Sequence, residues 1–381
     1  MTAKQELFNI LDAIGEQLDI TPTQFNNAKD RYEAVGKHLA EGEYCLINKK
    51  ICLKNGEIYP QGSIRLGTTV KPLGLNEFDV DLVFFTPNIS TDDIDPTELN
   101  RLIGNRLRES ETYKKMMEPL KRGWRIIYHD EFYLDITPSI ENHTEPYNKS
   151  ELVPDRKIQN WKSSNPKEYA EIFDATALKS PYFSITKSII ENRASTVSDF
   201  PENIPKKPLL KRYVQLFKRH RDVMFENKNH APISVIITTL AMHSYAYCIA
   251  NFEYDNEYDL LLAVLDHMPA FIQKENGKYK IMNPTTEHEN FAERWNEVPQ
   301  KKDAFDEWHK EVTKFFNRFH ENMGQHRVFE VLEDGFGKKP ISNIANQYTA
   351  NITQRRNIGL LATSALEVPV KSNTFFGKNV L

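Results

Sequence analysis

Cysteine and long apolar runs are both scarce in this chain of 381 residues. Its three cysteines, Cys45, Cys52 and Cys248, provide neither a disulfide framework nor the paired CxxC spacing of a zinc site. No apolar run approaches the roughly 20 residues that a membrane-spanning helix requires. The segment from Met1 to Ile20 is interrupted by charged side chains, which is typical of neither a secretory signal nor a transit peptide. We therefore expect a cytoplasmic protein without membrane segments.

An excess of positive charge is also absent. The chain has 49 Lys and Arg residues against 53 Asp and Glu residues, so its formal net charge is -4. Duplex nucleic acid is bound mainly by neutralising its phosphates, so this balance argues against strong binding of long duplex DNA. A local basic groove remains compatible with the composition. The chain is long enough for two or three domains or for one large body with two lobes.

The spacing of apolar residues predicts different secondary structure along the chain. Residues 4–41 show helical spacing with a break at Thr21-Pro22. Residues 44–140 alternate between strand and helix patterns, which favours one sheet with helices packed against it. The proline-rich run from Pro201 to Pro208 is typical of a linker, and the chain from Leu209 onward is predicted to be helical. Shorter helices are expected at residues 99–117, 167–174 and 184–193, and a polar tail from about Asp334.

Two aspartates stand inside an apolar run. The run from Phe78 to Phe85 is typical of a buried strand, in which alternate side chains share a face, so Asp79 and Asp81 point the same way. Two carboxylates on a buried strand are costly unless a cation neutralises them, and Mg²⁺ is a hard cation that takes carboxylate ligands. Asp93 and Asp95 form a similar pair beside a proline in a polar loop, where we do not expect a metal.

A third aspartate, Asp135, lies between Leu134 and Ile136 in another short strand pattern. If that strand neighbours the first, three carboxylates converge, which suits two Mg²⁺ ions roughly 4 Å apart in phosphoryl or nucleotidyl transfer. The other interpretation is an acid buried against an arginine, such as Arg125 or Arg65. Spacing alone does not decide between a metal site and an ion pair.

The segment Gly62-Ser63 is a small-residue turn that precedes these acids. A glycine lets the backbone approach a phosphate closely, and Ser63 adds a hydroxyl and a backbone N–H. The simpler interpretation is an ordinary turn in which Ser63 caps a helix, and this interpretation is favoured for the segment alone.

The order of these motifs resembles that of the polymerase-β-like nucleotidyltransferase superfamily: Gly-Ser, then Asp-x-Asp in a strand, then a single Asp in a later strand. The sequence is most similar to the bacterial cGAS/DncV-like nucleotidyltransferases, or CD-NTases, of the anti-phage CBASS systems. The similarity covers about residues 40–330. It is carried by Gln61-Gly62-Ser63 with Leu66-Gly67-Thr68, Phe78 to Val83, Leu134 to Pro138, Asn165-Pro166 with Tyr169-Ala170, Leu210-Lys211-Arg212 with Lys218 to Asp222, Asn283-Pro284, and Glu289 to Trp295.

This resemblance implies a template-free synthase that makes cyclic di- or trinucleotide second messengers from NTPs, with ATP and GTP as expected substrates. Asp79, Asp81 and Asp135 would be the catalytic residues and would hold two Mg²⁺ ions. The identity of the bases, the ring size and the linkage stay open, because they depend on a few contacts in the pocket.

The same resemblance assigns nucleotide binding to both lobes. In the first lobe Gln61, Gly62 and Ser63 would cradle the triphosphate. In the second lobe, a lysine on the helix that starts at Leu209 and a serine that opens the next helix would reach it. Lys218 and Ser234 match that pattern, with Lys211 as the alternative lysine because the phase of the helix cannot be determined from the sequence.

The implied fold is α+β: a polymerase-β-like nucleotidyltransferase lobe with a mixed sheet, and a C-terminal helical lobe, with the active site in the cleft between them. We expect N-terminal helices across the lobes at 1–43, the nucleotidyltransferase core at 44–200, the helical domain at 201–333, and an extension and tail at 334–381. Residues 290–295 are expected to pack between the lobes, and contact with a ligand is the less favoured alternative.

The sequence departs from the family pattern at two points, and both affect which partners we expect. The zinc-binding insertion of the animal DNA sensor is absent, so activation by DNA is not expected. Regulatory or conjugating CBASS partners are compatible with the family, although the bulky Leu381 does not favour attachment through the C-terminus. We expect a monomeric catalytic unit. The alternatives are an RNA- or tRNA-tailing nucleotidyltransferase of the same superfamily and a catalytically idle nucleotide-binding scaffold.

Overall fold

The computed structural model describes residues 3–41, 53, 56–74, 77–87, 89–155, 159–183, 207–320 and 323–357. Several expectations lie outside these residues: the helix at 184–193, most of the linker at 201–208, the last residues from 358 to 381, and the surroundings of Cys45 and Cys52. Cys248 is described, and it is buried without a disulfide partner among the described cysteines.

A mixed sheet forms the first lobe. Within the described residues its strands are β1 (Glu57–Pro60), β2 (Phe78–Thr86), β3 (Met117–Pro119), β4 (Trp124–Tyr128), β5 (Phe132–Glu141), β6 (Glu151–Asp155) and β7 (Asn160–Ser164). The order β1-β2-β5-β4-β3 forms the main path, and β6 pairs with β5 and β7. Strands β2 and β5 are parallel, and the other pairs are antiparallel. The mixed sheet expected from the sequence is confirmed.

One face of this sheet is covered by helices, and the other faces a cavity. The helices α2 (Pro22–Ala40), α4 (Pro96–Arg108) and α5 (Glu111–Met116) pack on the covered face. Val80, Leu82 and Phe84 of β2 belong to that core, and all are nearly inaccessible to solvent. Because side chains alternate along a strand, Asp79 and Asp81 point to the opposite face. The apolar residues of β2 thus stabilise the core, whereas its two aspartates lie on the face toward the cavity.

The segment expected as one helix over residues 99–117 forms two helices. Asp95 accepts a hydrogen bond from the Glu98 backbone N–H at the start of α4, and Ser110 accepts one from the Tyr113 N–H at the start of α5. Such side chains satisfy backbone donors that a helix start leaves free, so a second cap begins a second helix. Asp95 is therefore a helix cap.

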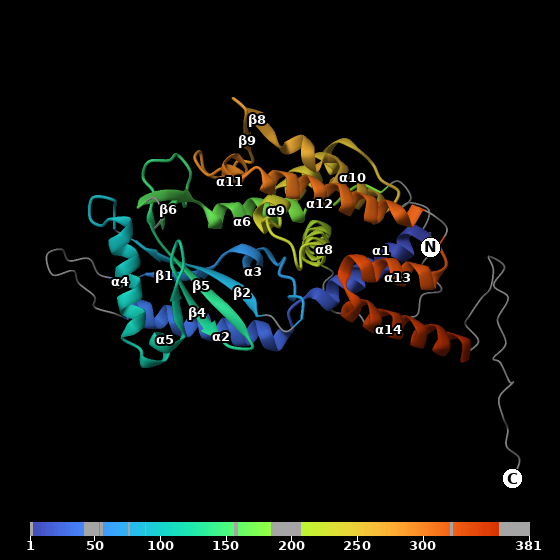
Figure 1. The fold of residues 1–381 in the computed structure, drawn as a ribbon, viewed down its shortest axis with the longest axis horizontal. Coiled ribbons are helices and arrows are strands. Elements are labelled where there is room, and N and C mark those ends of the chain that lie inside the picture. The colour runs from blue at the N-terminus through green and yellow to red at the C-terminus, as the bar shows by residue number, and fades with distance from the viewer. Residues whose placement is uncertain are drawn as a thin grey trace, which may run out of the picture.

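The second lobe is helical, and Figure 1 shows α13 and α14 at the end of the molecule away from the sheet, with α8 between them and β2. A large apolar core joins its helices to α1 (Ala3–Leu18). The helices are α6 (Pro166–Ala177), α8 (Leu209–Met224), α9 (Ser234–Asn251), α10 (Glu257–His267), α11 (Glu293–Glu297), α12 (Gln300–Asn317), α13 (Gln325–Phe336) and α14 (Lys338–Asn357), with short 3-10 turns η2 (Met268–Phe271) and η3 (Arg318–His320) and a hairpin of β8 (Gln273–Glu275) and β9 (Lys278–Lys280).

The polar tail expected from about Asp334 is wrong up to residue 357. The helix α13 continues to Phe336, and α14 follows after Gly337, whose φ of 84° is readily adopted only by glycine. Leu332, Phe336 and Ile341 are fully buried in the large core. Helical spacing is present here, but the many polar residues between the apolar ones obscured it.

A buried polar contact fastens α1 to α8. The side chain of Arg212 is 3% exposed and donates to Asp12 Oδ1 at 2.7 Å and to Gln215 Oε1 at 3.0 Å. Gly15 makes room for it, because a Cβ at that position would lie 2.2 Å from Arg212 Cδ. Asp19 adds a weaker contact at 3.5 Å. The N-terminal helix is therefore held by charge as well as by apolar packing.

Replacing Arg212 with methionine should lower the free energy of unfolding by about 3–5 kcal/mol, because Asp12 would remain partly buried without its partner. The shift of the urea unfolding midpoint measures this loss. Arg327→Met is the control, because Arg327 is 67% exposed and its pair with Glu330 should contribute at most about 1 kcal/mol. Equal midpoints for the two variants would show that the buried pair does not stabilise the fold.

Candidate active site

Asp81 and Asp135 lie directly opposite each other on the parallel strands β2 and β5. The expectation that the two acidic strands are neighbours is therefore confirmed. Asp79 lies two residues before Asp81, on the same face. On the far side of β5, β4 places Arg125 opposite Asp135. The three carboxylates and one guanidinium thus form a row across the sheet.

The guanidinium of Arg125 lies between two of the carboxylates. Its Nε donates to Asp135 Oδ1 at 2.7 Å, and its Nη2 donates to Asp135 Oδ2 at 2.8 Å and to Asp79 Oδ1 at 3.1 Å. Among the described residues no three acidic, histidine or cysteine side chains are gathered closely enough to form a metal site. Of the two arginines considered from the sequence, Arg125 forms the ion pair with Asp135, whereas Arg65 pairs with Asp174 at 2.7 Å.

These acids remain short of positive charge despite Arg125. Burial, followed by repulsion from Asp135 and Asp79, raises the pKa of Asp81 to about 7. Burial and repulsion from Asp135 also raise the pKa of Asp79, and the nearby Arg125 only partly offsets this. A raised carboxyl pKa means that the ionised form is destabilised, so a further cation at this place would be favourable. Carboxylate oxygens are ligands that suit Mg²⁺.

The segment Gly62-Ser63 begins a short helix, α3 (Gly62–Leu66), that lies against the acids. Gly62 has a φ of 59°, and a Cβ there would lie 2.4 Å from Asp81 Oδ2. The backbone N–H of Gln61 donates to the Asp81 carbonyl at 2.8 Å, which fastens the segment to β2. Ser63 lies inside α3, and its Oγ accepts from Thr69 Oγ1 at 3.2 Å. The N-cap position belongs to Gln61, so Ser63 is not the ordinary cap considered from the sequence.

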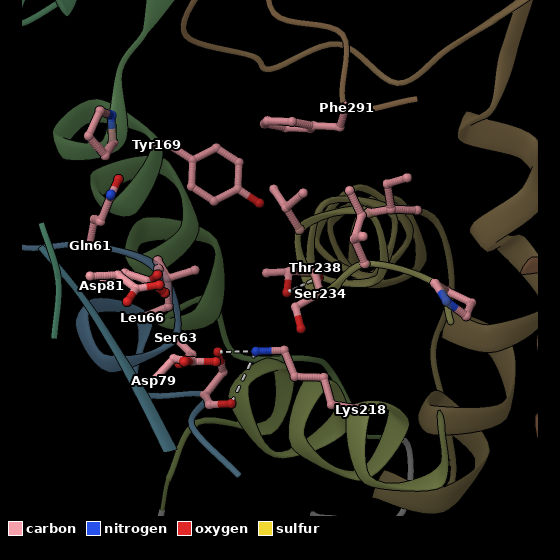
Figure 2. A pocket seen from close by; sticks show the side chains of 18 of the residues that line it. Gln61, Ser63, Leu66, Asp79, Asp81, Tyr169, Lys218, Ser234, Thr238 and Phe291 are labelled. Carbon is pink, nitrogen blue, oxygen red and sulfur yellow. Dashed lines mark hydrogen bonds between the residues drawn. The ribbon is translucent and has the colours of Figure 1, made fainter. Parts of the chain in front are cut away.

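From the helical lobe, Lys218 and Ser234 face the same cavity (Figure 2). The Nζ of Lys218 donates to Thr68 O at 3.2 Å and to Thr68 Oγ1 at 3.0 Å. Ser234 is the first residue of α9, and its Oγ accepts from Arg221 Nη1 at 3.0 Å. Lys211 instead pairs with Asp174 at 2.7 Å and does not line the cavity. The contacts therefore favour Lys218 over Lys211 as the lysine available to a ligand.

A cavity of about 1160 Å³ lies between the two lobes. Its floor is the acidic row with Gly62-Ser63, and its opposite wall comes from α8 and α9. Single-ligand pockets usually have about 300–1,000 Å³, so this one has room for more than one mononucleotide. Tyr169 and Phe291 both line the cavity and contact each other edge to face, with ring centroids 6.1 Å apart and ring planes at 90° (Figure 2).

The loop before α11 and the first residues of α11 also line the cavity. Residues 290–295 were expected to pack between the lobes, with ligand contact as the less favoured alternative. Ala292 and Trp295 are indeed buried in the large core, and five of the six residues (Asn290, Phe291, Glu293, Arg294 and Trp295) also line the cavity. The cavity-lining Arg221 was not singled out from the sequence. Loop residues of this kind carry no periodic signal, and their role depends on how the lobes face each other.

The buried Lys218 leads to a prediction about proton uptake. Burial, followed by repulsion from Arg221, lowers the pKa of Lys218 to about 7, although Asp222 and Asp81 oppose the shift. At pH 8 the amine is therefore mostly neutral, and a bound triphosphate would favour the ammonium form. We expect binding of inorganic triphosphate in EDTA at pH 8 to take up about 0.9 proton more in wild type than in Lys218→Arg, because arginine stays charged.

Isothermal titration calorimetry in buffers of different ionisation enthalpy measures this difference. The difference should shrink toward zero as the pH falls below 6, where Lys218 is already protonated. Equal proton uptake by wild type and Lys218→Arg at pH 8 would contradict a role for Lys218 in binding the triphosphate.

No helix in the described part of the chain is long and apolar enough to cross a membrane. This agrees with the absence of long apolar runs in the sequence.

Comparison with known proteins places this architecture in a family. The model of the Second Messenger Oligonucleotide or Dinucleotide Synthetase domain matches residues 1–176. The c-di-GMP synthase of Roseivirga ehrenbergii is 30% identical over 399 aligned residues, which cover 98% of each chain.

Solved structures share the fold at lower identity. The CD-NTase CdnG of Bradyrhizobium diazoefficiens, in complex with GTP, superposes with a TM-score of 0.68 at 20% identity, over 90% of this chain and 98% of that one. CdnC of E. coli MS115-1, in a complex with HORMA, gives 0.60 at 12% identity, over 87% and 96%. GTP-bound DncV of Vibrio cholerae gives 0.53 at 13% identity, over 88% and 86%. Since the similarity to the Roseivirga enzyme extends over nearly the full length of both chains, this chain belongs to the bacterial cGAS/DncV-like nucleotidyltransferases, enzymes that synthesise cyclic oligonucleotides.

Proposed function

We propose that this enzyme makes a cyclic dinucleotide from GTP, without a template and with Mg²⁺. The single observation that carries the proposal is the placement of Asp81 opposite Asp135, with Asp79 on the same face, at the floor of a cavity that Lys218 enters from the other lobe. The choice of GTP is supported by the relative named c-di-GMP synthase and by the GTP complex of the structurally similar CdnG.

The acidic row supplies oxygen donors of the kind that divalent cations take, although Arg125 now holds two of its three carboxylates and the described residues form no closed metal site. Its donors are three carboxylates, and the raised pKa of Asp81 marks a place where positive charge is missing. Asp79, Asp81 and Asp135 would hold two Mg²⁺ ions, with Asp79 and Asp81 on the triphosphate side and all three on the side of the attacking hydroxyl. When bound, the ions would activate that hydroxyl and neutralise the charge that develops on the phosphates.

The remaining groups position the substrate. The absence of a side chain at Gly62 lets a phosphate approach the backbone beside Asp81, and Gln61 and Ser63 complete that wall. Lys218 and Ser234 would bind the outer phosphates from the opposite wall. These contacts align the α-phosphate for attack by the 3′-hydroxyl of the second nucleotide, which forms one phosphodiester bond and releases pyrophosphate.

Cyclisation requires two nucleotides to occupy the same cavity. A volume of about 1160 Å³ supports this requirement. After the first bond forms, the linear intermediate must turn around so that its own triphosphate meets Lys218 and its free 3′-hydroxyl meets Asp135. A second release of pyrophosphate then closes the ring.

We place this synthesis in anti-phage defence, as in the CBASS systems of the family. The solved complex of CdnC with HORMA supports the idea of a regulatory partner protein. The cavity is lined from both walls by described residues of a single chain, which supports a monomeric catalytic unit.

Incubation with the four NTPs and Mg²⁺, without any primer, tests the proposal. Mass spectrometry should find a phosphatase-resistant cyclic dinucleotide of guanine. Formation of product only after addition of RNA would favour an RNA-tailing enzyme instead. NTP turnover that is unchanged in Asp79→Asn/Asp81→Asn would show that these acids are not the site.

A further inference from the structure

The acidic row continues beyond Arg125 to a fourth charged residue. Register across the sheet places Asp81 on β2 opposite Asp135 on β5, Asp135 opposite Arg125 on β4, and Arg125 opposite Glu118 on β3. Side chains directly opposite each other on one face of neighbouring strands lie within reach of each other. Arg125 therefore has carboxylates on both sides, with the catalytic pair toward the cavity and Glu118 toward the sheet edge.

In the described structure, the guanidinium lies on the cavity side. It makes two hydrogen bonds to Asp135 and one to Asp79, and it stacks over the Tyr133 ring at 4.5 Å from the centroid. Its side chain is 23% exposed, so it is not locked in a closed core. Glu118 is exposed and attracts Arg125 electrostatically, while the hydrogen bonds of the guanidinium go to Asp135 and Asp79. Glu118 therefore offers Arg125 a second carboxylate on the outer side.

A divalent cation at the proposed site would need the oxygens that Arg125 now uses. Both oxygens of Asp135 and one of Asp79 accept from the guanidinium. An ion bound by Asp135 would take some of the same lone pairs, and its double positive charge would repel the guanidinium at close range. Asp81 accepts no hydrogen bond from Arg125, so an ion held mainly by Asp81 and Asp79 would disturb only the contact to Asp79.

We propose that Arg125 is a positioning residue that serves as an internal cation, holding Asp79 and Asp135 together before metal binds and moving toward Glu118 when a divalent ion takes Asp135. This inference rests on the metal site of the proposed function. Arg125 lowers the affinity for an ion at Asp135. This effect lasts until an ion at Asp79 and Asp81, together with the triphosphate, weakens the hydrogen bond from Arg125 to Asp79. Premature binding of a catalytic ion is thereby disfavoured.

Binding of Mn²⁺, without nucleotide, at pH 8, tests this inference. Mn²⁺ is a spectroscopic substitute for Mg²⁺, and electron paramagnetic resonance measures the free ion. Arg125→Gln should lower the apparent Kd for Mn²⁺ about tenfold, because it removes a competing charge. Glu118→Gln should raise the apparent Kd about threefold, because it removes the carboxylate on the outer side. Opposite shifts would show that both residues act on the ion through their charges, and the charge-keeping Arg125→Lys then tests the competition for the Asp135 oxygens.

The controls separate the possible failures. Arg101→Gln changes an exposed arginine of α4 outside the cavity and should leave the Mn²⁺ affinity unchanged. If Arg125→Gln does not fold, Arg125→Lys keeps the charge without the paired hydrogen bonds and should lower the Kd about threefold. Unchanged or weaker Mn²⁺ binding in folded Arg125 variants overturns the inference. If Asp135→Asn also leaves Mn²⁺ binding unchanged, the proposed metal site itself is wrong.

Discussion

Replacing Asp135 with asparagine should lower the rate of product formation from GTP at least about a thousandfold, which corresponds to about 4 kcal/mol in the activation free energy. In the proposed mechanism Asp135 lies on the side of the attacking hydroxyl, so its loss would remove a ligand of the activating ion. The change keeps the size of the side chain, and β5 is buried on its other face by Leu134 and Ile136, so the strand should remain in place.

Binding of the triphosphate should survive this change. Asp79 and Asp81 lie on β2, and Gly62 of α3 approaches Asp81, whereas Asp135 comes from the next strand. The Kd for GTP, measured by calorimetry, should therefore change by less than about threefold while the rate of turnover collapses. A parallel loss of binding and turnover would mean that Asp135 serves the triphosphate rather than the attacking hydroxyl.

Asp95→Asn is the matched control. Asp95 caps α4 outside the cavity, and asparagine is an equally good cap. Its turnover should equal that of wild type. If Asp135→Asn keeps more than about a tenth of wild-type turnover, the assignment of the activating acid to β5 is wrong.

The acidic row shows what local sequence can predict. An apolar run with two aspartates at alternate positions determines that Asp79 and Asp81 share a face, because that follows from strand geometry alone. The pairing of β2 with β5 was an additional assumption, supported by the order of the motifs, and the register confirms it. The sequence left open whether these acids form a metal site or an ion pair. The described side chains show an ion pair with Arg125 at the place where a metal site was expected.

The cavity wall shows what local sequence leaves undetermined. Lys211 and Lys218 are seven residues apart on one helix, so their spacing puts them on nearly the same side, and only the packing of α6 against α8 assigns Lys211 to Asp174. The residues around the start of α11 line the cavity because of how the two lobes face each other. Such placements depend on contacts between residues more than a hundred positions apart, as in the hydrogen bond from Asn165 Nδ2 to Thr285 O at 3.0 Å.

The second large effect is expected at Gly62. Alanine there should lower the rate of product formation about a hundredfold, because displacement of a catalytic group by even about 1 Å is costly. The added Cβ would lie 2.4 Å from Asp81 Oδ2, and the positive φ of 59° would add backbone strain. Product formation and thermal unfolding, measured on the same samples, separate these two effects.

Gly277→Ala is the matched control for the strain at Gly62. Gly277 has a φ of 78° in the turn between β8 and β9, and a Cβ there would meet no atom within 4 Å. Both variants should lose about 1–3 kcal/mol of stability through strain, whereas only Gly62→Ala should lose turnover. If both variants keep full turnover, Asp81 tolerates displacement, and the close approach of Gly62 to its carboxylate is not what holds this acid in place for catalysis.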